Sequence, residues 1–168
     1  MADGAPRFKS FVLARNGNFP NSTLPVVVYG RAASGEAEVR ALFERNGWPP
    51  QWTDSVFDYH HFHSTAHEAL GVAAGEARLE LGGPGGSMVD IAVGDIVVLP
   101  AGIAHRLESS SGDFAVVGAY PPGQDWDILK GRDEEWEKAV PNIAAVALPD
   151  TDPVGGNNGP LPDLWRKD

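Results

Sequence analysis

Hydrophobic and polar residues alternate along much of this chain with the two-residue period that is typical of β-strands. Glycine and proline, 20 and 14 residues in all, divide the alternating stretches from one another at short intervals. Short strands at this spacing from Val56 to Ala119, without helices between them, predict a β-sandwich or a closed β-barrel. The expected strands cover residues 24–29, 57–63, 76–81, 88–93, 96–99, 105–109 and 114–119.

A helical pattern is expected between the strand at 24–29 and the strands that follow it. Val39, Leu42 and Phe43 recur at three- and four-residue spacing between Gly35 and Gly47, while charged residues occupy the positions around them. Gly47 is followed by Trp and two prolines, a combination that ends helices. The sequence therefore predicts one amphipathic helix ahead of the main β region.

The strand pattern stops after Tyr120. A short helix is expected at Asp133–Ala139, and the tail, rich in Pro, Gly and Asn, is expected to run over the surface from Pro149 onward. There is no internal repeat or low-complexity linker, so the 168 residues predict a single domain. Its barrel core is expected at about 54–120, with an N-terminal extension (1–53) and a C-terminal extension (121–168).

Charge and composition narrow the possible partners. The formal net charge is −10, without a basic run, which disfavours binding to nucleic acid or to an anionic membrane surface. No apolar run approaches the roughly 20 residues of a membrane span, and the first residues lack the pattern of a secretory signal. We therefore expect a cytoplasmic protein whose partner is a small-molecule substrate.

Histidine placement predicts a metal site. His61 and His63 lie two apart on an expected strand, so both imidazoles point to the same side, and Glu68 and His105 follow turns that can bring them back. The chain has no cysteine, so one divalent transition metal (Fe, Mn, Ni, Zn, Co or Cu) would be held by imidazole and carboxylate alone. Two positions stay open for substrate or oxygen if the metal is octahedral.

These residues match two motifs of the cupin family. In the first, four residues separate the His-x-His pair from Glu68, and six separate Glu68 from a glycine; in the second, a glycine, a Pro-x-Gly turn and a histidine follow in order. The matching residues are His61, His63, Glu68 and Gly75, then Gly94, Pro100, Gly102 and His105. The second motif usually ends in Asn, where this chain has Ser109, a departure that leaves the ligands intact.

Four further segments resemble the bacterial YjlB-type cupins: 16–21, 46–50, 60–68 and 120–126. The resemblance implies an all-β fold, a jelly-roll β-barrel with N- and C-terminal extensions and a few short helices. It also implies a homodimer that pairs edge to edge, and a ligand set like that of metal-dependent dioxygenases.

Other polar and aromatic residues are candidates for catalysis or substrate binding. Glu68, His67 and Tyr59 are the candidate acid–base groups, although Tyr59 is equally well explained as a core aromatic. His60 is out of phase with the ligands and is expected to pack or hydrogen-bond at an interface. Tyr120 ends the last expected strand and is a candidate for contact with substrate.

The loop after Tyr120 is a candidate cap over the mouth of the barrel. Gln124 and Trp126 lie there between Gly and Pro residues, and both are candidate substrate-binding residues, with packing as the alternative role for Trp126.

Three functions are consistent with this site. The leading hypothesis is a metal-dependent enzyme acting on a small organic molecule, most plausibly a mononuclear-metal oxygenase. The alternatives are a non-oxidative isomerase, epimerase or lyase of a sugar or hydroxy acid, and a non-catalytic protein that binds a small metabolite.

Overall fold

The computed structural model describes residues 6–166, and within them the chain is mostly β. The strands are β1 (Phe8–Leu13), β2 (Ser22–Tyr29), β3 (Pro50–Asp54), β4 (Glu68–Ala74), β5 (Glu76–Leu81), β6 (Ser87–Ala92), β7 (Ile96–Leu99), β8 (His105–Ser110) and β9 (Ala115–Ala119). The helices are α1 (Glu36–Arg45), a 3₁₀ turn (Asp133–Glu135), α2 (Trp136–Ala145) and α3 (Leu161–Leu164). The mostly-β class predicted from the sequence is confirmed.

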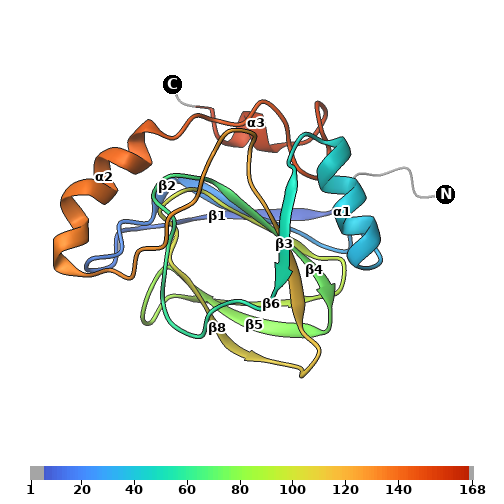
Figure 1. Cartoon of the computed structure of the whole chain (residues 1–168), viewed down its shortest axis with the longest axis horizontal. Coiled ribbons are helices and arrows are strands. Elements are labelled where there is room, and N and C mark those ends of the chain that lie inside the picture. The colour runs from blue at the N-terminus through green and yellow to red at the C-terminus, as the bar shows by residue number, and fades with distance from the viewer. Residues whose placement is uncertain (1–5, 167–168) are drawn as a thin grey trace.

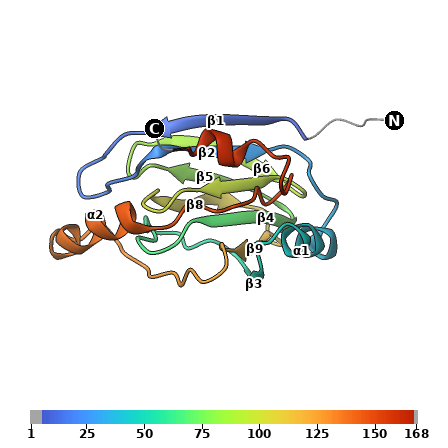
Figure 2. The ribbon, with the colours of Figure 1, turned by 90° about the horizontal axis from the view of Figure 1, so that it is seen from above.

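The strands form two antiparallel sheets. One sheet has six strands in the order β1-β2-β7-β4-β9-β3, and the other has three in the order β6-β5-β8. Figure 1 shows the smaller sheet lying below the larger one, with α2 and α1 at the sides and α3 at the top. In Figure 2, seen from above, α2 and α1 lie at opposite ends of the molecule. Among residues 6–166, no strand pairing joins the two sheets into a hydrogen-bonded closed barrel.

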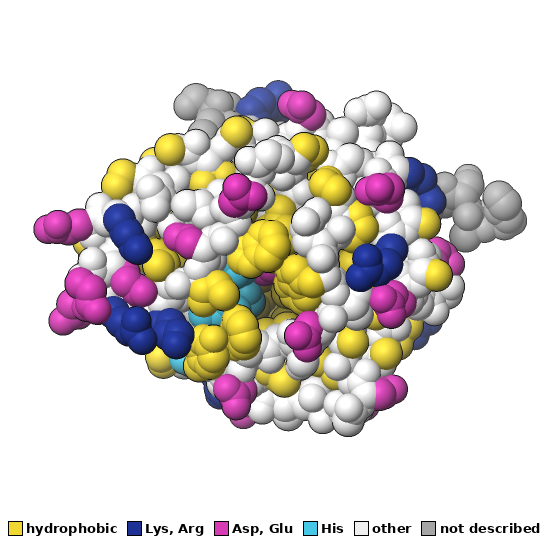
Figure 3. Space-filling model, in the orientation of Figure 1, with side chains coloured by type: hydrophobic (Ala, Val, Ile, Leu, Met, Phe, Trp, Pro, Cys, Tyr) yellow, Lys and Arg dark blue, Asp and Glu magenta, His cyan; other side chains and the backbone are white. Residues whose placement is uncertain are grey.

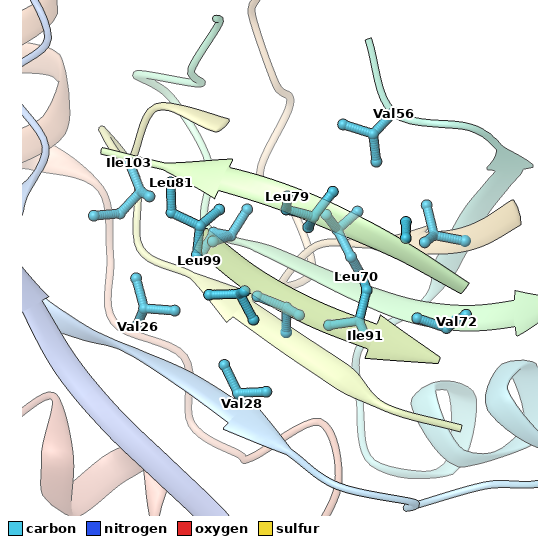
Figure 4. Close-up of a cluster of buried hydrophobic side chains, with 14 of the residues drawn as sticks. Val26, Val28, Val56, Leu70, Val72, Leu79, Leu81, Ile91, Leu99 and Ile103 are labelled. Carbon is cyan, nitrogen blue, oxygen red and sulfur yellow. The ribbon is translucent and has the colours of Figure 1, made fainter. Parts of the chain in front are cut away.

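Side chains from both sheets share one hydrophobic core. Leu70 and Val72 of β4 pack there against Leu79 and Leu81 of β5, as the close-up in Figure 4 shows. Residues alternate along β4, so Ala69 points to the opposite side of the six-stranded sheet. The large sheet therefore separates an inner core, which it shares with the small sheet, from an outer one.

Helices and the C-terminal tail cover the outer side of the six-stranded sheet. Val39 and Phe43 of α1 join this outer core together with Leu161 and Trp165, both fully buried. The indole N–H of Trp165 donates to the carbonyl of Pro25 in β2 at 2.8 Å. The expectation that the tail merely runs over the surface is wrong, because its last turn carries two apolar side chains that complete this core.

The limits expected for the barrel core also differ from the structure. β1, β2 and β3 lie before or at residue 54, yet they belong to the same sheet as β4, β7 and β9. The sheet thus begins at Phe8, and the expected N-terminal extension supplies three of its six strands. Its edge strand β1 was missed because its apolar residues are largely exposed and give no buried-strand signal.

Two further expectations need correction. The stretch 57–63 is not a regular strand: it makes isolated bridges, between His61 and His105 and between Phe62 and Leu129. The helix expected at 133–139 is a 3₁₀ turn followed by α2, which continues to Ala145 with a proline inside it. None of the helices within residues 6–166 has the length and apolar character needed to cross a membrane.

Candidate metal centre

Three histidines meet where the two sheets approach each other. Backbone hydrogen bonds in both directions join His61 to His105, the first residue of β8. The N–H of Gly102 donates to the carbonyl of His63 at 2.8 Å, and Gly102 has a φ of 102°, which side chains disfavour. A Cβ there would lie 2.3 Å from the carbonyl oxygen of Asn21. The glycine of the Pro-x-Gly turn is therefore required for this close approach.

Backbone carbonyls fix the orientation of all three imidazole rings. Nδ1 of His61 lies 3.0 Å from the carbonyl of Tyr59, and Nδ1 of His105 lies 2.9 Å from that of Ile103. Nδ1 of His63 lies 2.5 Å from the carbonyl of Asp127. A carbonyl oxygen only accepts, so each Nδ1 carries the hydrogen and each neutral ring keeps its lone pair on Nε2.

The free nitrogens converge on one point. One ring nitrogen from each of His61, His63 and His105 lies within 4.8 Å of the others, and all three residues are buried. Rings in this tautomer are ready to bind a metal, because the Nδ1–H bond to oxygen fixes each ring and leaves Nε2 as the ligand atom.

Glu68 completes the group. Its Oε1 lies 3.3 Å from Nε2 of His63 and 3.3 Å from Nε2 of His105. Within the described residues, this buried oxygen has no hydrogen-bond partner. Two ligands about 2.1 Å from one ion would lie about 3.0–3.4 Å apart, so the observed spacing suits a shared metal ion. The three histidines thus form a group that could hold a metal ion, and Glu68 lies against two of them.

Electrostatics within the group follow from burial and mutual contact. Burial, with repulsion from His105, lowers the pKa of His61 to about 3. Burial also opposes charge on His63 and Glu68, but their mutual attraction outweighs it, raising the pKa of His63 and lowering that of Glu68. Glu68 therefore carries a negative charge that must be balanced by a proton on a facing histidine or by a metal ion.

A chain of hydrogen bonds reaches Glu68 from the other side. The hydroxyl of Tyr120 donates to Oε2 of Glu68 at 2.6 Å, and Nε1–H of Trp52 donates to that hydroxyl at 2.9 Å. Burial and the neighbouring Glu68 charge raise the pKa of Tyr120, so its hydroxyl keeps its proton. Trp52 packs against Gly118, where a Cβ would lie 2.2 Å from the indole ring. β3 and β9 together therefore position the Glu68 carboxylate.

A cavity of about 200 Å³ opens above the group. The four candidate ligands line its interior together with Leu70 and Tyr120, and Asp54 and Ser55 line it as well. In the space-filling view of Figure 3, histidine side chains are visible inside a hollow whose mouth is surrounded by hydrophobic side chains. The remaining lining residues are Trp52, Val56, Phe57, Trp126 and Ile128. A small organic molecule can therefore reach the candidate metal site.

The loop that borders this mouth is tied to the histidine segment. The carboxylate of Asp127 accepts from the backbone N–H of Ser64 at 2.6 Å and from its hydroxyl at 2.5 Å. The hydroxyl of Thr65 donates to the carbonyl of Asp125 at 2.7 Å. Trp126 lies between these anchors, and its ring stacks on that of Tyr120 with 4.2 Å between centroids. The same contacts thus hold His63 and place an aromatic wall beside it.

The candidate substrate-binding residues are only partly brought to the cavity. Tyr120 and Trp126 line it, whereas Gln124 does not. The side-chain oxygen of Gln124 accepts from the N–H of His67 at 3.1 Å, and its amide donates to the carbonyl of Ala147 at 2.8 Å. Gln124 therefore links the loop to the end of α2 rather than binding in the cavity.

Two candidate acid–base groups lie away from the cavity. His67 precedes Glu68 and points to the other side of the sheet: its Nδ1 accepts from the N–H of Ala101 at 2.9 Å, and its ring lies 4.7 Å from that of Trp165. Tyr59 does not line the cavity and is 36% exposed. Tyr59 contributes to the site through its backbone carbonyl, which orients the ring of His61, and not through its hydroxyl. His60 faces away too, with Nε2 3.6 Å from Glu80.

Several residues of the site had no signal in the sequence. Trp52 was placed in the N-terminal extension, and Asp54 stands at the expected start of the barrel core without a motif. Asp127 lies 64 residues beyond His63, also in a loop without a motif. Only the pairing of β3 with β9 and the contacts of the 124–128 loop bring them to the histidines. A sequence pattern does not predict such contacts, because they depend on which loop lies over the mouth.

Comparison with known proteins finds a relative that matches over nearly its full length. The chain is 40% identical over 160 residues to the uncharacterized protein YjlB of Bacillus subtilis (strain 168), and the match covers 95% of this chain and 97% of the relative. No family model matches the chain. Identity at this level over nearly the full length of both proteins shows common ancestry, so the chain belongs to the YjlB family.

Proposed function

We propose that this protein is a metal-dependent cupin enzyme acting on a small organic molecule, most plausibly a mononuclear-metal oxygenase. The observation that carries the proposal is the buried Oε1 of Glu68, which lacks a hydrogen bond and faces the ring nitrogens of His63 and His105 beneath an open cavity. A buried carboxylate at such a position is costly unless a metal ion or a protonated histidine balances its charge.

His61, His63, Glu68 and His105 would hold the metal. When bound, a divalent metal would accept two adjacent oxygens of a substrate and provide a site for oxygen or Lewis-acid chemistry. The protein supplies the rest of the site: backbone carbonyls orient the imidazoles, and Tyr120 holds Glu68 in place. The aromatic walls limit access of water to the reacting molecule.

The cupin fold is part of the proposal. Two antiparallel sheets with a shared core are consistent with a jelly roll. All three motif glycines, Gly75, Gly94 and Gly102, have positive φ. The metal ligands also come from the two motifs in the order that cupins require. An experimental structure with the metal bound would test the fold and the ligand set together.

A homodimer is also proposed from the resemblance to cupins. In the described part of the chain, residues 6–166, β1 pairs with β2 alone, so its other edge is open there. Phe8 and Val12 on this strand are 46% and 58% exposed. An open strand edge with exposed apolar residues favours pairing with another chain. Sedimentation equilibrium of the wild type and of a Val12→Pro variant tests the pairing, since proline removes a donor from the edge.

Elemental analysis of the purified protein tests the metal centre. We expect about one transition-metal ion per chain in the wild type and a large loss in His105→Ala and Glu68→Gln. His60→Ala is the matched control, because His60 is the neighbouring histidine that points away from the group. Full metal occupancy in His105→Ala, or none in the wild type after reconstitution, would contradict the proposed site.

The reaction type needs a second measurement. Oxygen uptake is recorded for the metal-loaded protein with a panel of small compounds that carry two adjacent oxygens. The same protein loaded with zinc is measured for comparison. Uptake that requires a redox-active metal supports the oxygenase. Product formed equally well without oxygen and with zinc would favour the non-oxidative isomerase or lyase instead.

A further inference from the structure

The polar atoms of two side chains in the cavity wall, Trp52 and Tyr120, are already engaged in hydrogen bonds. Trp52 uses its indole N–H on the Tyr120 hydroxyl, and Tyr120 uses its hydrogen on Glu68. What these two side chains offer to a bound molecule is ring surface rather than hydrogen-bond donors. Val56, Leu70 and Ile128 extend the apolar surface. A ligand body within this cavity therefore meets mainly carbon.

The size of the cavity suits one ring. Its volume is about 200 Å³, and an apolar cavity of about 150 Å³ is known to accept benzene. Trp126 stacks on Tyr120 with an angle of 6° between the rings, so the two parallel rings form one aromatic pair on this side of the mouth. A planar ring can pack against the edges or the outer face of such a pair.

Charge at the mouth has one sign. Apart from the candidate metal ligands, Asp54 is the charged residue that lines the cavity, and it lies exposed at the end of β3. Within residues 6–166, no Lys or Arg lines the cavity. Lys130 lies over the ring of Tyr59, 4.7 Å from its centroid, and is outside the lining. An anionic substituent on the ligand body would therefore lose its hydration on binding, and no cationic side chain of the lining would compensate for that cost.

We infer that the ligand of this site is a small planar molecule with two adjacent oxygens for the metal and a body that carries no negative charge. This inference rests on the proposed metal centre and narrows its substrate class. The adjacent oxygens occupy the floor beside the histidines, and the uncharged body lies along Tyr120 and Trp126. Acidic sugars, and ring compounds with a free acid group opposite the oxygens, are outside this class.

Two probes of similar size separate the alternatives. 4-Methylcatechol is neutral at the end remote from its oxygens, whereas 3,4-dihydroxybenzenesulfonate is negative there, and sulfonate is a poor metal ligand. Calorimetric titration of the metal-loaded protein should give binding of 4-methylcatechol at least roughly tenfold tighter than that of the sulfonate, because the sulfonate charge has no partner. Equal or tighter binding of the sulfonate would overturn the inference.

An Asp54→Asn variant tests the charge at the mouth. It keeps a side-chain oxygen for the N–H of Ser55, which Asp54 now accepts at 2.7 Å. Sulfonate affinity should rise about two- to fivefold, as expected for an exposed charge, while 4-methylcatechol affinity stays unchanged. Asp58→Asn is the matched control, because Asp58 is exposed on the same segment but does not line the cavity. Equal effects of the two substitutions would contradict the role of Asp54.

Metal content is measured on the same samples, so that the two proposals can fail separately. A sample that holds metal but binds both probes equally contradicts the substrate class and leaves the metal centre standing. A sample that holds no metal even after reconstitution contradicts the proposed function, and the substrate class with it.

Discussion

The hydroxyl of Tyr120 donates a hydrogen bond of 2.6 Å to Oε2 of Glu68, and this contact determines which carboxylate oxygen is available to a metal. Oε1 is left facing His63 and His105, while Oε2 is held by the hydroxyl. Tyr120 is thus a positioning residue as well as part of the cavity wall.

Replacing Tyr120 with Phe should weaken metal binding about 10- to 100-fold, as is typical when a partner that orients a ligand is lost. The ring and its stack with Trp126 are kept, so folding should be preserved. Competition with a chelator of known affinity measures the change. Tyr29→Phe is the control, since the buried Tyr29 hydroxyl bonds to Asp152 on the outer side of the sheet and should leave metal affinity unaltered.

Metal-free protein should lose stability in acid through His61. Its pKa is about 3 when folded, against an ordinary value of 6.5. Between these values the unfolded chain binds more protons than the folded one, so the free energy of unfolding falls as the pH falls, by at most about 1.4 kcal/mol per pH unit. His63 contributes with the opposite sign, because its pKa is raised in the folded protein.

Comparison with His61→Asn isolates this contribution, since the Asn amide can still donate to the Tyr59 carbonyl but does not titrate. Urea unfolding of both proteins between about pH 4 and 6 should show a shallower pH dependence in the variant. A difference in unfolding free energy that stays constant over this interval would contradict the assignment.

Removing the metal should lower the melting temperature. A metal that is present at a thousandfold its dissociation constant stabilises the folded state by about 4 kcal/mol. For a chain of this size that corresponds to a shift of roughly 10 °C. Scanning calorimetry before and after chelation measures it, and re-addition of the metal should restore the original value. Glu68→Gln should show little change on chelation, because it holds little metal to begin with.

The C-terminal turn should contribute strongly to stability. Trp165 is fully buried in the outer core, so Trp165→Ala should lower the free energy of unfolding by about 3–5 kcal/mol. Trp126→Ala should cost clearly less, since that side chain is 38% exposed. Urea denaturation compares the two. A similar small loss in both variants would mean that the tail is not a structural part of the domain.

The sequence predicted the buried histidine triad better than it predicted the sheets around it. His61, His63, Glu68 and His105 were identified from spacing and motifs, because turns after a short strand leave few ways to arrange such ligands. β1 and the burial of Trp165 were not predicted, because an exposed edge strand and a Pro-rich tail both lack periodic apolar residues. Their places depend on contacts with distant parts of the chain.

The rule that successive side chains point to opposite sides holds on the regular strands and fails in the turns. Ala69 and Leu70 point to opposite sides of the large sheet, as alternation requires. Tyr59 was expected in phase with the ligands, but the stretch 57–63 forms only isolated bridges, so the two-residue period does not apply at Tyr59. Gln124 was placed near the cavity on loop proximity alone, and the structure shows it bonded to Ala147 instead.

The atoms that orient the three imidazoles belong to the peptide backbone, and this has a consequence for how the site tolerates mutation. Tyr59, Ile103 and Asp127 supply carbonyl oxygens, so drift in the first two side chains leaves the acceptors in place. Sequence variation among relatives would therefore carry no record of these contacts. The imidazole rings can keep their orientation while the side chains around the mouth change. Related proteins can therefore differ in the ligand they prefer and still share the same candidate metal site.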